Sequence, residues 1–91
     1  MTNAPMTKRT AKLLVHCARL MGEPESPFTL EDLEDYTASV NDPYSLEGMQ
    51  KQTIPALKRR GFVTQLFDGR WQVTDRGFHQ AMHISGGYGL L

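Results

Sequence analysis

The hydrophobic pattern of the chain changes its period at Phe62, and this change constrains the fold more than any other feature. Before Phe62 the apolar residues recur every three to four positions, as in amphipathic helices. From Phe62 to Thr74 they alternate with polar residues on both sides of Asp68-Gly69. An Asp-Gly pair between alternating segments favours a hairpin, because both residues tolerate the positive φ of a type I′ turn. The sequence therefore predicts helices followed by a β-hairpin.

A two-residue loop at Asp68-Gly69 sets the register that we expect for this hairpin. The expected cross-strand pairs are Phe67 with Arg70, Leu66 with Trp71, and Thr64 with Val73. The buried face then carries Phe62, Leu66, Trp71 and Val73. The other face carries Val63, Gln65, Phe67, Arg70 and Gln72.

The first predicted helix runs from about Thr7 to Met21, before the stop at Gly22. Its apolar face holds Leu13, Leu14, Cys17, Leu20 and Met21. Its polar face holds Lys8, Lys12, His16 and Arg19. Val15 falls on the polar side and has no predicted place in the core. Cys17 is expected to be an inert core thiol.

Two more helices are predicted before the hairpin. Thr29 caps the first of them, which runs from Leu30 to about Thr37, with Asp32 completing a capping box. Asp42-Pro43 is expected to start the second, which runs from about Pro43 to Arg60. Its buried side would carry Leu46, Met49, Thr53, Ile54 and Leu57. Its outer side would carry Tyr44, Gly48, Lys51, Gln52, Pro55 and Arg59.

Pro55 interrupts this last pattern. Inside a helix, proline loses a hydrogen bond and collides with the preceding turn, at a cost of about 3 kcal/mol. The helix is therefore either kinked, or broken near Thr53 with a new turn starting at Ile54.

Beyond the hairpin, Thr74 or Asp75 can cap a short helix that runs to about His83 and buries Phe78 and Met82. We expect one domain over residues 7–84, between a flexible N-terminus (1–6) and a glycine-containing tail (85–91).

Composition places the chain among globular domains. It has 91 residues, of which 40% are hydrophobic and 22% charged, and its formal net charge is zero. The charges are segregated: residues 1–22 carry only bases, residues 23–47 only acids, and residues 48–91 mostly bases. A single cysteine, no apolar run long enough for a membrane span and no signal peptide predict a cytoplasmic protein.

Three segments carry a resemblance to a known class. Residues 56–63 (Ala-Leu-Lys-Arg-Arg-Gly-Phe-Val) and 69–77 (Gly-Arg-Trp-Gln-Val-Thr-Asp-Arg-Gly) resemble the end of the recognition helix and the wing of bacterial winged-helix regulators. Residues 28–33 resemble the opening of their second helix. The resemblance covers about residues 7–83 and implies an α+β winged helix-turn-helix, with a three-helix core, a hairpin wing and a short C-terminal helix. Pro55 departs from the class, and the chain has little length for the dimerisation helices of larger members.

On this resemblance, the function expected is binding of double-stranded DNA by a small transcriptional regulator of bacterial or phage type. The expected DNA-binding residues are Ser45, Gly48, Lys51, Gln52, Lys58, Arg59, Arg60 and Arg70. Gln and Arg or Lys can read base edges, and Gly48 either allows close approach of the backbone or simply weakens the helix. Each of these residues can equally be an ordinary exposed polar residue.

The acids of residues 31–35 keep an alternative open, because they would repel phosphates if they faced DNA. The alternative is a winged-helix module that binds a protein, as an adaptor or inhibitor, with Phe67, Val63 and Tyr88 as anchors. A homodimer is expected if DNA is the target, through Val15 or the tail from Tyr88 to Leu91.

The residues predict no enzyme and no cofactor. His79 and His83 have a spacing that could share a helix face, but no cysteine pair or His-Glu pattern of metal-site spacing accompanies them. Gly86-Gly87-Tyr88-Gly89 lacks the lysine and the strand–helix context of a phosphate loop.

Overall fold

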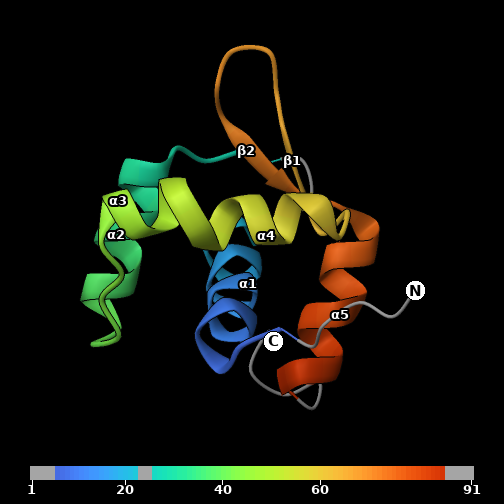
Figure 1. Ribbon diagram of the computed structural model, residues 1–91, viewed down its shortest axis with the longest axis horizontal. Helices are drawn as coiled ribbons and strands as arrows, with labels where there is room; N and C mark the ends of the chain where they lie inside the picture. The colour runs from blue at the N-terminus through green and yellow to red at the C-terminus, as the bar shows by residue number, and fades with distance from the viewer. Residues whose placement is uncertain (1–5, 23–25, 86–91) are drawn as a thin grey trace.

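The computed structural model describes residues 6–22 and 26–85, and α1 (Lys8–Met21) is its central helix. α1 contacts helices on three sides and strand β2 (Trp71–Val73) (Figure 1). Thr7 caps it by accepting a hydrogen bond from the Thr10 amide, and Gly22 ends it with a φ of 72°. The predicted bounds are confirmed.

The buried face of α1 is wider than its hydrophobic pattern predicts. Val15 is only 8% exposed and His16 only 7%, so the predictions that Val15 lacks a core role and that His16 is a surface residue are wrong. α1 lies between other elements rather than on one side of a core, and a central helix buries more than one stripe. Cys17 is fully buried as predicted, and burial raises the pKa of its thiol well above the usual range.

α2 (Leu30–Ser39) starts with the predicted capping box. The Thr29 hydroxyl accepts from the Asp32 amide at 3.0 Å, and the Asp32 carboxylate accepts from the Thr29 amide at 3.2 Å. The helix extends two residues beyond the predicted end. It buries Leu30, Leu33 and Thr37 against α1 and leaves Glu31, Asp32 and Asp35 exposed.

The prediction that a helix starts at Asp42-Pro43 is wrong. The chain is non-helical there, and α3 (Leu46–Gly48) begins three residues later with Ser45 as its cap. Side chains of α2 hold this connection: the Thr37 hydroxyl accepts from the Tyr44 amide, and Glu34 accepts from the Leu46 amide. Tyr44, expected on an outer helix face, is instead 5% exposed.

The predicted long third helix is broken near Pro55, which is one of the two outcomes that the sequence predicted. α3 leads into a single π turn, η1 (Met49–Thr53), and α4 (Ile54–Arg59) follows. The Ile54 amide donates to the Met49 carbonyl, so Pro55 enters the first turn of a new segment, where its missing N–H costs little. The three pieces still form one rod across α1 (Figure 1), with Met49, Ile54 and Leu57 buried.

The hairpin forms, but its predicted register is wrong by one residue. β1 (Val63–Gln65) pairs with β2 so that Val63 faces Val73, Thr64 faces Gln72 and Gln65 faces Trp71. The Leu66 amide donates to the Arg70 carbonyl, which makes the loop three residues long and ends it at Gly69 with a φ of 95°. The Asp68 carboxylate accepts from the Arg70 amide at 3.0 Å, and this bond holds the longer loop.

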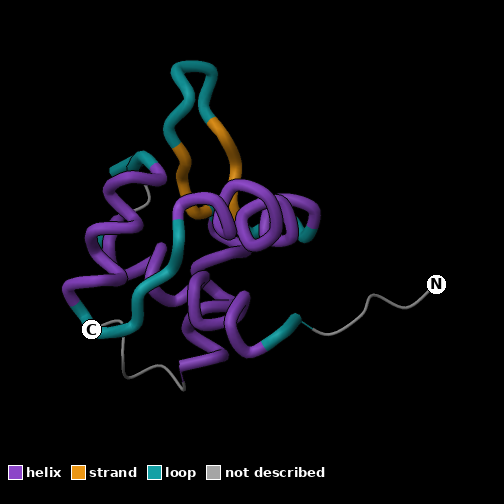
Figure 2. Tube along the Cα trace, turned by 60° about the vertical axis from the view of Figure 1, so that its left-hand side comes forward, coloured by secondary structure: helices purple, strands orange, loops and turns teal. Residues whose placement is uncertain are grey.

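The shifted register changes which side chains of β1 are buried. Trp71 and Val73 are buried as predicted, at 8% and 1% exposure. Val63 is buried opposite Val73, where Thr64 was expected, and Leu66, which was expected in the core, is only partly covered. Phe67 stands at the tip in full contact with solvent, on a loop that projects beyond the helices (Figure 2).

Phe28 joins the hairpin as a third strand position. Its amide donates to the Trp71 carbonyl at 2.9 Å, and the Trp71 amide donates to the Phe28 carbonyl at 2.7 Å. The segment before α2 is thereby bonded to the edge of β2 that does not pair with β1. The fold is α+β, with its hairpin between α4 and the last helix.

α5 (Asp75–Ser85) packs along α1. Thr74 caps it by accepting from the Gly77 amide at 3.0 Å, as predicted. The prediction that Met82 is buried is wrong, since this residue is 44% exposed. Phe78, which was also predicted to be buried, is only partly covered. The small residues Gly77 and Ala81 face the core instead, because α5 approaches its neighbours closely. The tail from Tyr88 to Leu91 lies outside the described residues.

None of the helices in residues 6–22 and 26–85 combines the length and apolar character that a membrane span requires.

Candidate nucleic-acid interface

The rod formed by α3, η1 and α4 lies beside the hairpin, and a groove of about 330 Å³ runs between them. Its lining residues are Leu30, Gln50, Ile54, Pro55, Lys58, Gln65 and Trp71. Lys58 reaches over the Trp71 ring, with Nζ 6.0 Å from the ring centroid. Lys58 was predicted as a binding residue, whereas Gln50 and Gln65 were not. The hairpin register decides that Gln65 faces this groove.

Ser45 and Gly48 serve the start of the rod. The Ser45 hydroxyl accepts from the Gly48 amide at 3.0 Å, which caps α3. A Cβ on residue 48 would lie 2.9 Å from that hydroxyl oxygen, so glycine leaves room for the cap. The cap therefore explains the glycine at position 48, and a close approach of DNA is not needed to explain it.

Lys51 and Gln52 point outward from η1 and are exposed, as expected for binding residues. Lys51 Nζ lies 3.0 Å from the Glu47 carboxylate, one helical turn back. This exposed pair is weak, since both side chains are about 70% exposed, but it offsets part of the positive charge.

Arg70 lies beside the hairpin tip, where its guanidinium binds Asp68 at 2.8 Å. The bond lowers the pKa of the Asp68 carboxyl, and the same pairing raises the pKa of Arg70. Arg70 therefore reaches solvent as half of an ion pair. Of the three basic residues Lys51, Arg59 and Arg70, only Arg59 has no carboxylate partner among the described residues.

Arg59 and Arg60 lie at the C-terminal end of α4, away from the groove. They border a recess with Gly61, Phe62 and Arg76, the last of which comes from the first turn of α5. The structure thus brings Arg76, which was not among the predicted residues, next to two that were. Its place depends on how α5 packs against the end of α4.

The acids of α2 do not line the groove beside the hairpin. Asp32 and Asp35 border a separate depression between α2 and the C-terminal end of α1, together with Tyr36 and Ser39. Glu34 accepts from the Leu46 amide. Asp32 and Asp35 therefore border a different depression from the groove in which repulsion of phosphates was expected.

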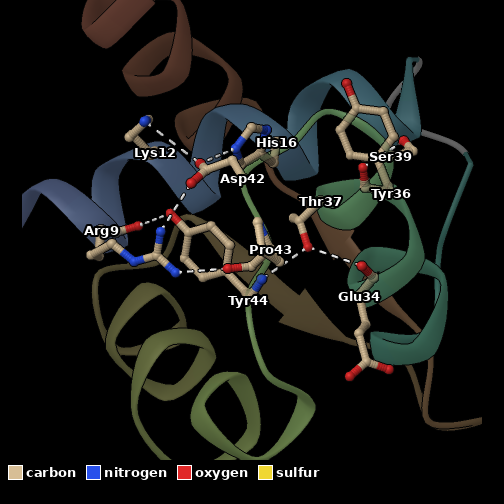
Figure 3. Close-up of polar contacts among 10 residues, drawn as sticks. All are labelled: Arg9, Lys12, His16, Glu34, Tyr36, Thr37, Ser39, Asp42, Pro43 and Tyr44. Carbon is tan, nitrogen blue, oxygen red and sulfur yellow. Dashed lines mark hydrogen bonds and ion pairs between the residues drawn. The ribbon is translucent and has the colours of Figure 1, made fainter.

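The interaction network around Asp42 (Figure 3) had no counterpart among the predicted sites. The Asp42 carboxylate binds Arg9 at 3.0 Å and His16 at 2.8 Å, with Lys12 at 3.6 Å. Arg9 also donates to the Pro43 carbonyl, and its guanidinium lies 3.7 Å from the centroid of the Tyr44 ring. These contacts fix the turn between α2 and α3 onto α1, and so orient the rod.

Asp42→Asn is expected to lower the free energy of unfolding at neutral pH by about 1–3 kcal/mol, because His16, Lys12 and Arg9 favour the ionised carboxylate. The His16 hydrogen bond is the main cause that lowers the Asp42 pKa below 3.8. The folded pKa lies below the unfolded one, so this stability is fully present above about pH 5, declines as the pH falls below 3.8 and is lost once the pH passes through the lower folded pKa. Urea unfolding from pH 7 to pH 3 measures it.

The exposed Asp35→Asn serves as the control for that substitution, with an expected change within about 0.5 kcal/mol. Equal acid sensitivity of the wild type and Asp42→Asn would contradict a stabilising role for the carboxylate.

His79 and His83 are both exposed on α5. The described residues hold no group of three or more His, Cys, Asp or Glu side chains that could bind a metal ion.

Comparisons of the chain with protein-family models, with curated proteins and with solved structures found no match. The functional interpretation therefore depends on the residues and their arrangement alone.

Proposed function

We propose that the chain is a small winged-helix protein that binds double-stranded DNA as a transcriptional regulator of bacterial or phage type. The observation that carries this proposal is the relation between the rod and the hairpin. α2, the turn at Asp42 and the rod form a helix-turn-helix, and the hairpin stands beside the rod as a wing (Figure 1). The bridge from Phe28 to β2 supplies the short strand between the first two helices.

In this proposal the exposed side of η1 enters the major groove of DNA. Gln50, Lys51 and Gln52 lie there in sequence and are all exposed. Glutamine can pair with adenine through two hydrogen bonds, and lysine can bind guanine. Lys58 and Arg59 would contact phosphates, and Arg70 would approach the adjacent backbone from the wing.

The surface of the rod and the charge of its neighbours support this orientation. Four of the seven residues that line the groove between rod and wing are apolar; its polar lining residues are Lys58 and two glutamines, and none is a carboxylate. Because Asp32 and Asp35 border a different depression, they do not interrupt this groove. Basic and amide side chains without acids are the composition expected of a surface that contacts DNA.

A homodimer remains a prediction that accompanies this proposal. Of the two candidate interfaces, Val15 is buried within the chain and cannot serve. The other, from Tyr88 to Leu91, lies outside the described residues.

A protein-binding module is the second candidate function, and the hairpin tip favours it. Phe67 is fully exposed there, and aromatic side chains are frequent anchors in protein interfaces. The ion pairs of Lys51 and Arg70 also reduce the positive charge that DNA binding would use.

Duplex binding by a triple variant separates the two candidates. Lys51→Ala/Arg59→Ala/Arg70→Ala should bind a mixed-sequence duplex at least about tenfold more weakly than the wild type at low salt, because its phosphate contacts are lost. Fluorescence anisotropy measures the affinity. Lys8→Ala/Arg19→Ala/His83→Glu, which lowers the net charge by the same amount at exposed positions of α1 and the end of α5, is the matched control and should bind nearly as well as the wild type.

Equal loss in both triple variants would mean that only net charge matters, and it would contradict the proposed surface. A protein partner that wild type binds and Phe67→Ala does not, together with unchanged duplex affinity in the first triple variant, would favour the protein-binding module.

A further inference from the structure

The recess between the end of α4 and the start of α5 is strongly cationic. It measures about 690 Å³, and Arg59, Arg60, Gly61, Phe62 and Arg76 line it. Three of these five residues are arginines, and none is acidic. The chain as a whole has no net charge, so this concentration of guanidinium groups is a local property of the fold.

The two walls of the recess are fixed to each other by Thr74. Its hydroxyl donates to the Gly61 carbonyl at 2.6 Å and accepts from the Gly77 amide at 3.0 Å. The Thr74 amide also donates to the Phe62 carbonyl at 3.0 Å. The end of α4 and the first turn of α5 are therefore held at a set distance, and the recess is preformed.

Arg76 is placed by packing rather than by an ion pair. Its Cζ lies 5.6 Å from the centroid of the Phe62 ring, and its side-chain stem passes beside Gly61, where a Cβ would lie in ordinary contact with Arg76 Cδ at 3.8 Å. Gly61 itself has a φ of 78°, which turns the chain at the edge of the recess. Packing on an aromatic ring positions a guanidinium while its N–H groups stay available to an anion.

Two pairs of arginines differ in their partners. Arg9 and Arg70 each bind a carboxylate, at 3.0 Å and 2.8 Å. Arg59 and Arg76 bind none in the part of the chain that the structure describes. Like charges that face one recess repel each other, and an anion between them would relieve that repulsion. A phosphate group fits this arrangement best, because guanidinium groups bind phosphate oxygens through paired N–H donors.

We propose that this recess is a phosphate-binding site in which Arg59 and Arg76 hold the anion. On the proposed function, on which this step rests, the anion is a backbone phosphate of duplex DNA. The site would be a contact separate from the exposed side of η1 and from the wing. Arg76 would then belong to the DNA-binding surface, although it lies on the helix that follows the wing.

An NMR titration tests the recess without DNA. Inorganic phosphate, added against sodium chloride at constant ionic strength, should shift the Gly61 and Phe62 amide resonances saturably in the wild type. Arg59→Ala/Arg76→Ala should lose these shifts, and Lys8→Ala/Arg19→Ala, which removes the same charge from α1, should keep them. Shifts that phosphate and chloride produce equally, or that spread over all basic residues, would overturn the site. If the double variant unfolds, Arg59→Ala alone replaces it, because Arg59 is exposed.

A duplex titration with the same variants tests the source of the phosphate. Arg59→Ala/Arg76→Ala should bind the duplex about tenfold more weakly, and its affinity should depend less steeply on salt, by about one to two in the log–log slope. The control should match the wild type. If inorganic phosphate still shifts the amide resonances saturably while the double variant and the control bind the duplex with equal affinity, the result would support the phosphate site and contradict DNA as the source of the phosphate. A wild type that binds no duplex while phosphate still saturates the recess would refute the proposed function and leave a site for a free phosphate compound.

Discussion

Trp71→Ala is expected to lower the free energy of unfolding by about 3–5 kcal/mol, the usual cost of removing a large core side chain. Trp71 is 8% exposed, begins strand β2 and exchanges backbone hydrogen bonds with Phe28. Its ring therefore packs where the hairpin and the connection before α2 meet. Urea unfolding followed by far-UV circular dichroism measures the loss, since the variant has no other tryptophan for fluorescence.

Phe67→Ala is the matched control for Trp71, because it removes an aromatic side chain from the same hairpin at a fully exposed position. Its expected effect is within about 0.5 kcal/mol. A loss below about 1 kcal/mol for Trp71→Ala, or an equal loss for the two variants, would mean that the hairpin does not pack on the core as described.

Gly77→Ala should destabilise the fold by about 3 kcal/mol, although alanine normally stabilises a helix relative to glycine by about 0.5–1 kcal/mol. A Cβ on residue 77 would overlap the Phe62 carbonyl oxygen and lie 2.8 Å from Val73 Cγ1. The Phe62 carbonyl also accepts from the Thr74 amide, so it cannot move without loosening that bond. The expected sign is thus opposite to the one that helix propensity gives.

Thermal and urea unfolding of Gly77→Ala, compared with the exposed His79→Ala on the same helix, measure this effect. His79→Ala should change stability by no more than about 0.5 kcal/mol. A Gly77→Ala variant as stable as the wild type, or more so, would show that α5 does not approach the Phe62 backbone this closely.

Local sequence signals predicted most of the elements and several of their ends. The capping box at Thr29 and Asp32, the break at Pro55 and the cap at Thr74 each depend on residues within a few positions of one another. Short-range hydrogen bonds and steric exclusion decide such features, so a single sequence contains them. Burial of Trp71 and Val73 followed in the same way from alternation along one strand.

The errors arise where two local options compete or where distant residues meet. Asp68-Gly69 is compatible with loops of two and three residues, and the bond from the Asp68 carboxylate to the Arg70 amide accompanies the longer one. Asp42-Pro43 has the residues of a helix start, but Arg9 and His16, more than twenty positions earlier, bind the Asp42 carboxylate. No local pattern contains that pairing.

The candidate binding surface could likewise be predicted only in part. The exposure of Lys51 and Gln52 followed from helical periodicity, whereas the carboxylate partners of Lys51 and Arg70 required the folded side chains. Arg76 could not be joined to Arg59 from the sequence, because the hairpin separates α4 from α5 along the chain and the two helix ends meet only in the folded protein.

The wild type's affinity for duplex DNA as a function of salt tests the central claim most directly. Anisotropy of a labelled mixed-sequence duplex should show binding at low ionic strength. Contacts from Lys58, Arg59, Arg70 and Arg76 to phosphates give an expected log–log slope of about −3 to −4, because each contact releases counterions from the DNA. No binding at low ionic strength, or an affinity that does not change with salt, would contradict the account.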